Sequence, residues 1–112
     1  MSNESEKKIS KLQILEQNFQ NLLQQKQNFQ SQKMEVEFAL MEVETAEGEI
    51  YKITGTVMIK TDKEKIISEL NSKKETVNIR FNAVEKQEKR LRNEIENLQK
   101  EVIAEIGGEK NE

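Results

Sequence analysis

The sequence predicts a mainly α-helical chain in which two long helices form an antiparallel coiled coil and are joined by one short β-hairpin. Two apolar seams with alternating three- and four-residue spacing run from Leu12 to Val43 and from Ile67 to Val102. A segment of alternating character, residues 50–61, separates them. No proline interrupts the seams, and one inside a helix costs about 3 kcal/mol. A hairpin between two long helices turns the second back along the first, so we expect the helices to pair in antiparallel fashion.

The composition favours a single elongated domain over residues 1–112 and excludes several function classes. Charged residues make up 35% of the chain, hydrophobic residues 34%, and the mean hydropathy is −0.85, which is typical of long exposed helices. The net charge of −3 comes from interleaved signs, which disfavours nucleic-acid binding. The absence of Cys and His removes disulfides, most metal sites and most nucleophilic chemistry, so we expect no cofactor.

No apolar run approaches the roughly 20 residues that a membrane span needs. The opening residues also lack the apolar core of a signal peptide. We therefore expect a cytoplasmic protein with no membrane partner.

The first helix is predicted over about 4–47. Asn3 and Glu6 have capping-box spacing at its start, and Gly48 suits the left-handed position after its end. Eight of the ten positions in its seam are apolar: Leu12, Leu15, Phe19, Leu22, Lys26, Phe29, Lys33, Val36, Leu40 and Val43.

The hairpin is predicted over 50–60 because residues alternate with period two and β-branched types are frequent. Gly55 is the natural turn or bulge position, although the pairing register stays open. Along an extended chain one face carries Tyr51, Ile53, Gly55, Val57 and Ile59. We therefore expect one apolar face and one polar face.

The second helix is predicted over about 62–106. Thr61 and Glu64 form a second capping box, and Gly107-Gly108 is expected to stop the helix and leave 107–112 as a frayed tail. Nine of the eleven seam positions are apolar: Ile67, Leu70, Lys74, Val77, Phe81, Val84, Glu88, Leu91, Ile95, Leu98 and Val102.

Polar residues in the seams allow two interpretations. In the antiparallel register Lys26 lies about one turn from Glu88, where an ion pair across the seam could fix the register. Alternatively, Lys26, Lys33 and Lys74 lay their aliphatic stems over the apolar stripe and keep their charges in water. We favour the second interpretation.

The hairpin points to assembly. A two-stranded sheet is at best marginally stable, and its edges and apolar face call for partners. We expect subunits to assemble through Ile50, Tyr51, Ile53, Gly55, Val57 and Ile59. The alternative is that the hairpin folds onto its own helices in a monomer.

At the other end, a group of apolar residues lies near the two helix termini: Ile9, Leu12, Leu98, Val102, Ile103 and Ile106. Because the second helix outlasts the first seam, some of them lack apolar partners. They predict either a reversible protein-binding surface or ordinary end packing with fraying, and the sequence favours neither.

The chain resembles beta-class prefoldin subunits over nearly its whole length. The resemblance is greatest in Ile50-Tyr51-Lys52-Ile53-Thr54-Gly55-Thr56-Val57-Met58-Ile59-Lys60-Thr61 and the helix entry Lys63-Glu64-Lys65. Gln24-Gln25-Lys26 and Phe81-Asn82-Ala83-Val84-Glu85-Lys86-Gln87-Glu88 resemble the family as well. Ile53 and the short tail after Ile106 depart from familiar members.

This resemblance implies a heterohexamer of two alpha-class and four beta-class subunits, whose hairpins join into a β-barrel from which coiled coils project. It also implies an ATP-independent chaperone that holds unfolded proteins at the coiled-coil tips, prevents aggregation and passes them to a group II chaperonin. The sequence has no Gly-x-x-x-x-Gly-Lys loop, in agreement with this. The compact form favours an archaeal source.

Two other functions compete with this one. A structural coiled-coil adaptor would bind one folded partner helix in a groove. An enzyme is disfavoured, because the cluster of Glu42, Glu44 and Glu47 is better explained as a solvated helix end than as catalytic carboxylates or a metal site.

Overall fold

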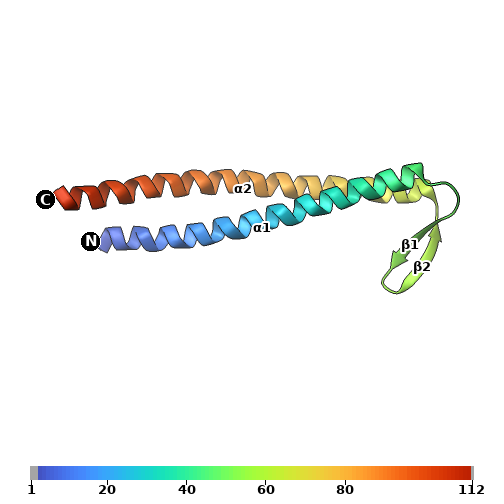
Figure 1. Ribbon diagram of the computed structural model, residues 1–112, viewed down its shortest axis with the longest axis horizontal. Helices are drawn as coiled ribbons and strands as arrows, with labels where there is room; N and C mark the ends of the chain where they lie inside the picture. The colour runs from blue at the N-terminus through green and yellow to red at the C-terminus, as the bar shows by residue number, and fades with distance from the viewer. Residues whose placement is uncertain (1–2, 112) are drawn as a thin grey trace. The chain divides into compact units, whose positions relative to one another are not determined.

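The computed structural model describes residues 3–111 and contains four elements. They are helix α1 (Asn3–Thr45), strands β1 (Ile50–Thr54) and β2 (Val57–Thr61), and helix α2 (Lys63–Asn111), in that order (Figure 1). The strands form one antiparallel two-stranded sheet. The predicted fold class, long helices with a small hairpin between them, is confirmed.

The chain divides into two compact units. The terminal unit comprises the described residues of Met1–Gln27 and Ala83–Glu112, and the hairpin unit is Asn28–Asn82. In the terminal unit the beginning of α1 and the end of α2 run side by side in opposite directions (Figure 1). Their core consists of Leu15, Ile95 and Leu98, with Leu12, Phe19 and Leu91 packed against it.

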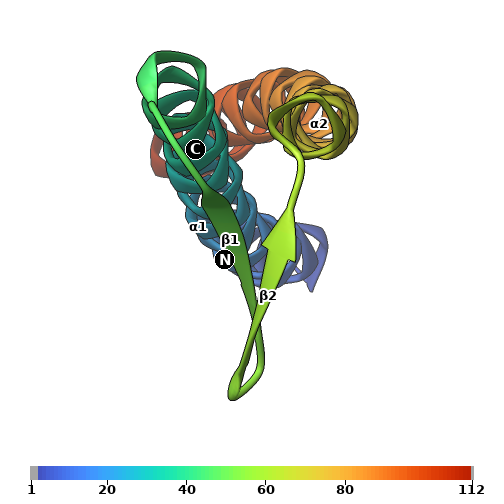
Figure 2. The same ribbon diagram turned by 90° about the vertical axis from the view of Figure 1, so that its right-hand side faces the viewer.

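In the hairpin unit the second half of α1 and the first half of α2 bury Val36, Leu40 and Val77. The Lys33 ammonium lies 5.9 Å from the centre of the Phe81 ring, a cation–π distance. Figure 2 shows β1 continuing from α1 and β2 leading into α2.

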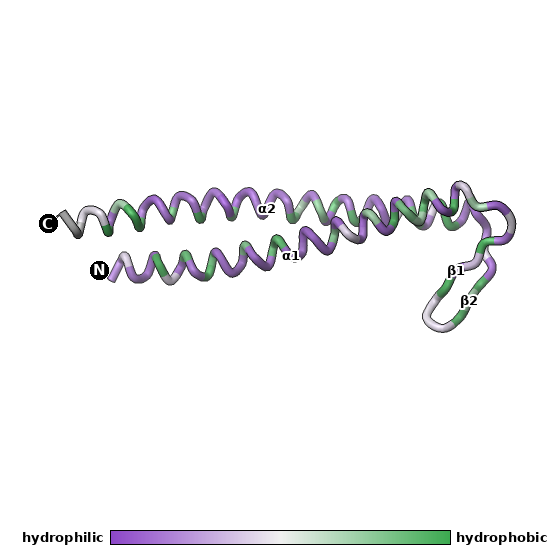
Figure 3. Tube along the Cα trace, viewed as in Figure 1, coloured by the Kyte–Doolittle hydropathy of each residue, from purple (hydrophilic) through white to green (hydrophobic). Residues whose placement is uncertain are grey.

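The predicted seams match the buried positions of both helices. Every seam residue named from the spacing is buried or partly buried, and apolar bands recur along both helices (Figure 3). The alternating three- and four-residue period thus identified the packed face of each helix.

The boundaries of the hairpin follow local rules. Helix α1 ends at Thr45, two residues before the predicted end, so Gly48 does not directly follow it. Gly48 has φ +88°, a left-handed conformation that suits glycine in the bend before β1. Asp62 precedes α2, and its carbonyl accepts the first helical hydrogen bond from Ile66 N at 3.1 Å. Asp62 is therefore the N-cap residue; the predicted capping role of Thr61 is wrong, because Thr61 still pairs with Ile50 in the sheet.

The predicted helix stop at Gly107-Gly108 is wrong. Helix α2 continues through both glycines to Asn111, so the expected frayed tail over 107–112 is helical as far as that residue. Neither glycine has a positive φ. Glycine in a helix costs roughly 1 kcal/mol relative to alanine, which weakens a helix without forcing it to end.

Candidate functional site

The tight turn of the hairpin determines how its side chains are distributed. Thr54 pairs with Val57, so the loop consists of Gly55 and Thr56 alone. Gly55 has φ +60° while Thr56 has no positive φ, the pattern of a type II′ turn, which favours glycine at its first central position. Across such a loop every odd-numbered residue pairs with an even-numbered one.

The predicted single apolar face is therefore wrong. Residues directly opposite each other in a sheet share a face, so Tyr51 and Ile53 lie beside Lys60 and Met58. Val57 and Ile59 lie on the opposite face, with Thr54 and Lys52 as their partners. The prediction assumed one continuous extended strand. The two-residue turn instead places the odd-numbered residues of β1 and those of β2 on opposite faces of the sheet.

Both faces of the hairpin are exposed. Five large apolar side chains are between 49% and 70% exposed: Tyr51, Ile53, Val57, Met58 and Ile59. Met58 was missing from the sequence-based set because it falls on the even-numbered positions. Figure 3 shows apolar residues in both strands.

Two ion pairs lie near the end of the hairpin that joins the helices. Lys52 Nζ donates to Glu69 Oε2 of α2 at 3.0 Å, and Lys60 Nζ donates to Glu49 Oε1 at 3.0 Å. The Tyr51 hydroxyl donates to Glu49 as well. That bond, followed by the bond from Lys60, lowers the pKa of Glu49, and the same tyrosine bond raises the pKa of Tyr51.

The apolar residues near the helix termini differ in burial and fall into three groups. Leu98 and Val102 are buried in the seam, whereas Ile9, Leu12 and Ile106 are partly buried. Ile103 is 70% exposed. Ile14, which lies off the seam and was not among the predicted residues, is exposed too.

A polar cluster joins the two helices at this end. Ser5 is fully buried, and its hydroxyl donates to Glu105 Oε2 at 3.0 Å. Lys8 Nζ donates to the other oxygen of Glu105 and lies 3.7 Å from Glu101. The bond from Lys8, with that from Ser5, lowers the pKa of Glu105, and the same Lys8 bond raises the pKa of Lys8.

The seam of the terminal unit contains a buried ion pair. Glu88 is 3% exposed, and it accepts hydrogen bonds from Lys26 Nζ and Arg92 Nη2, both at 2.8 Å. The guanidinium of Arg92 lies 5.7 Å from the centre of the Phe19 ring. The favoured interpretation of Lys26 as a residue that only snorkels is wrong, because its ammonium reaches the carboxylate across the seam.

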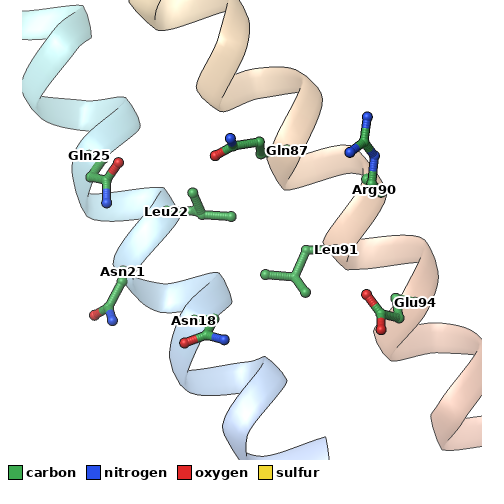
Figure 4. A pocket seen from close by; sticks show the side chains of 8 residues that line it. All are labelled: Asn18, Asn21, Leu22, Gln25, Gln87, Arg90, Leu91 and Glu94. Carbon is green, nitrogen blue, oxygen red and sulfur yellow. The ribbon is translucent and has the colours of Figure 1, made fainter.

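Next to this ion pair a groove of about 430 Å³ lies between α1 and α2 of the terminal unit. Leu22 and Leu91 point toward one another at its centre, and polar side chains surround them (Figure 4). These polar residues are Asn18, Asn21, Gln25, Gln87, Arg90 and Glu94. The groove contains no nucleophile paired with a base, and its residue types suit packing or peptide contact.

Within residues 3–111 no group of three or more acidic, His or Cys side chains is arranged to hold a metal ion. No helix in this described part combines the length and apolar character that a membrane span needs.

The family of the chain follows from comparison with known proteins. A family model described as "Prefoldin subunit" matches residues 6–109. The chain belongs to the prefoldin subunit family.

Within this family the chain is similar to beta subunits. Prefoldin subunit beta of Thermococcus onnurineus (strain NA1) is 45% identical over 53 residues, covering 47% of this chain and 46% of that protein. Prefoldin subunit beta of Sulfurisphaera tokodaii is 45% identical over 53 residues, covering 47% of this chain and 42% of that protein. The alignments thus span about half the length of the curated relatives or less, and the resemblance to the beta class is confirmed.

Solved structures agree over a longer stretch. The prefoldin beta subunit from Thermococcus strain KS-1 matches with a TM-score of 0.87 at 33% identity, covering 92% of each chain. The prefoldin beta2 subunit from the same strain matches with a TM-score of 0.71 at 16% identity, covering 80% of this chain and 97% of that one. The second match shows the fold alone.

Proposed function

We propose that this chain is a beta-class subunit of an ATP-independent chaperone that holds unfolded proteins. It assembles with an alpha-class prefoldin subunit and other beta subunits into a hexamer of two alpha and four beta chains. In the cytoplasm of an archaeon, the hexamer prevents aggregation and passes its clients, the unfolded proteins that it binds, to a group II chaperonin. The observation that carries the proposal is the exposed apolar hairpin in a chain of the prefoldin family.

The hairpin supports assembly because it is incomplete by itself. Two strands alone are marginally stable, and each leaves one edge of backbone donors and acceptors unpaired. Ile53 and Met58 on one face and Val57 and Ile59 on the other are all at least half exposed. Strands from other subunits would satisfy the edges and cover both faces, as in a closed β-barrel.

The helix termini support client binding. Ile103 is exposed, and Ile9, Leu12 and Ile106 are partly exposed. Individually weak apolar contacts from several subunits hold a non-native chain by avidity and still allow release. Leu98 and Val102 support this surface from the seam.

The proposed function needs no catalytic residue or nucleotide. The sequence contains no Cys, no His and no phosphate-binding loop. Holding and release depend on the balance of apolar contacts, so the chain is proposed to be no enzyme.

The proposal is tested on the chain assembled with the alpha-class subunit with which it co-purifies. We expect the particle to delay the aggregation of several unrelated, chemically unfolded proteins, measured by light scattering. Ile103→Ser in every beta subunit should weaken client binding by about 1 kcal/mol per contact, or roughly fivefold, because it removes an exposed apolar side chain.

Two controls accompany this variant. Ile79→Ser removes a similarly exposed isoleucine from α2 in the hairpin unit. This variant should delay client aggregation as well as the unsubstituted particle does. Val102→Ser acts on a buried position and should lower the Tm by destabilising the seam. Stoichiometric binding of one folded protein, with no delay of aggregation, would favour the coiled-coil adaptor instead.

A further inference from the structure

The outer side of α1 in the hairpin unit carries an apolar stripe that no part of the described chain covers. Met34, Phe38 and Met41 are 63%, 65% and 64% exposed. Their spacing of four and three residues places them on one helix face. At 1.5 Å per residue the stripe is about 10 Å long.

This stripe lies opposite the buried seam of α1. At 100° per residue, Met34, Phe38 and Met41 lie roughly 140° to 200° around the helix from Val36, which is buried in the seam. The hairpin approaches α1 elsewhere, because Tyr51 and Lys52 line a groove with Ala39 and Val43. The stripe is thus separate from both the coiled-coil seam and the hairpin.

Glutamates flank the stripe on both sides. By the same helical geometry Glu35 and Glu42 lie along one side, and Glu37 and Glu44 along the other. Among the described residues, Glu37 alone of the four has an ion-pair partner, Lys74 at the long distance of 3.9 Å. No Lys or Arg occurs between Met34 and Glu49.

This arrangement is costly for the helix itself. The last turn of α1 contains no basic residue, although cations stabilise the negative end of a helix and anions destabilise it. Lys63 of α2 offsets part of the cost by donating to the Glu44 carbonyl at 2.7 Å. The folding of α1 does not account for exposed apolar residues between glutamates of which three have no ion-pair partner among the described residues.

We propose that the stripe of Met34, Phe38 and Met41 docks basic, apolar segments of unfolded polypeptides. This inference rests on the proposed chaperone function and adds a second client surface with its own charge preference. Methionine side chains adapt to differently shaped apolar partners, and the flanking carboxylates select Lys and Arg beside them. A second copy of the same face is disfavoured, since the glutamates of the two copies would repel.

The test uses the full-length chain in its assembled particle and two fluorescent peptides. The basic probe carries Leu at helical spacing with Lys between, and the acidic probe has Glu in place of Lys. Fluorescence anisotropy should show binding of the basic probe, with weaker binding at higher salt, and little binding of the acidic one. Phe38→Ser should weaken binding of the basic probe about tenfold, the loss of affinity typical of an anchor residue. Ile79→Ser should leave that affinity unchanged.

A charge-matched pair of variants tests the flanks. Replacing Glu35, Glu42 and Glu44 together with Gln should weaken the basic probe severalfold and reduce its salt dependence. Replacing the exposed Glu16, Glu75 and Glu96 with Gln removes the same charge elsewhere and should have little effect. All these positions are exposed, and an unchanged Tm would exclude unfolding as the cause.

Three results would overturn the inference: no binding of the basic probe to the unsubstituted particle, equal binding to Phe38→Ser, or a loss of particle mass in Phe38→Ser. The last would make the stripe a subunit interface. A particle that binds the basic probe at the stripe but fails to delay aggregation would contradict the proposed function and leave the docking surface in place.

Discussion

At the residue scale, Glu88 is the most informative side chain. A buried carboxylate without partners would be strongly destabilising, because burial removes its hydration. Here Lys26 and Arg92 both donate to it, and Arg92 in turn contacts the Phe19 ring. The interaction joins α1 to α2 within the terminal unit and penalises any shift in their register.

A double-mutant cycle measures this ion pair. Lys26→Met and Glu88→Gln, singly and together, should give a coupling energy of about 1 to 3 kcal/mol in the free energy of unfolding, the range for contacting charges in one network. Chemical denaturation of the four proteins provides the numbers. Lys89 and Glu85, a more exposed pair on α2, serve as the control and should couple by about 0.5 kcal/mol or less. A coupling energy near zero for Lys26 and Glu88 would show that their ion pair does not fix the register of the two helices.

The sequence placed Lys26 and Glu88 about one turn apart but could not decide between an ion pair and snorkelling. That decision depends on a shift of a few ångströms between helices, which spacing along one helix does not contain. The same limit applies to Leu98 and Val102, whose burial depends on what α1 places opposite them.

At the scale of elements, the hairpin differs most from expectation. Its existence and strand positions follow from period two and from Gly55, but the distribution of its faces depends on whether the loop has two or three residues. The structure has two, so Ile53 and Val57 lie on opposite faces.

Assembly should therefore be sensitive to substitution on both faces. We expect Ile53→Lys and Val57→Lys each to reduce the particle mass measured by light scattering, because a charge placed in a buried subunit contact is strongly unfavourable. Ile79→Lys, at a similarly exposed position of α2, should leave the mass unchanged. If only Ile53→Lys has an effect, a single face makes the contacts.

The paired helix termini form the second element whose behaviour follows from the structure. Lys8, Ser5 and Glu105 join the start of α1 to the end of α2. The pKa of Glu105 is lowered and that of Lys8 is raised. The contribution of Glu105 to stability is therefore present above its ordinary pKa of 4.5 and lost as the pH falls below it, whereas that of Lys8 is present below 10.5 and lost as the pH rises above it.

Hydrogen exchange checks this dependence. Amides around Ser5 should lose protection as the pH falls below 4.5, after correction for the intrinsic rate. Glu105→Gln should lower protection at neutral pH and remove most of the acid dependence. Glu94→Gln, an exposed position on α2, is the control. Identical acid profiles for Glu105→Gln and the unsubstituted chain would show that other carboxylates are responsible.

At the scale of the whole molecule, the fold was predictable and parts of its surface were not. Long periodic seams predict buried helix faces, since the same spacing that repeats along the chain repeats in space. The outer stripe of Met34, Phe38 and Met41 follows the same period and was not predicted, because the seam on the opposite face of α1 already accounted for the helix. The continuation of α2 beyond Gly107 was not predicted. Glycine is only favoured where a helix ends, and inside a helix it costs little free energy.

The type II′ turn at Gly55 has one more consequence, for how many neighbours a subunit can have. A slip of one residue in the strand pairing would gather Tyr51, Ile53, Val57 and Ile59 on a single side. Such a hairpin would pack one partner against its single apolar face and would have no second apolar face for another. With the turn at Gly55 and Thr56, the hairpin keeps exposed apolar residues on both faces, as well as two unpaired strand edges. In the proposed assembly, Gly55 thus lets one subunit present apolar contacts on both faces of its hairpin.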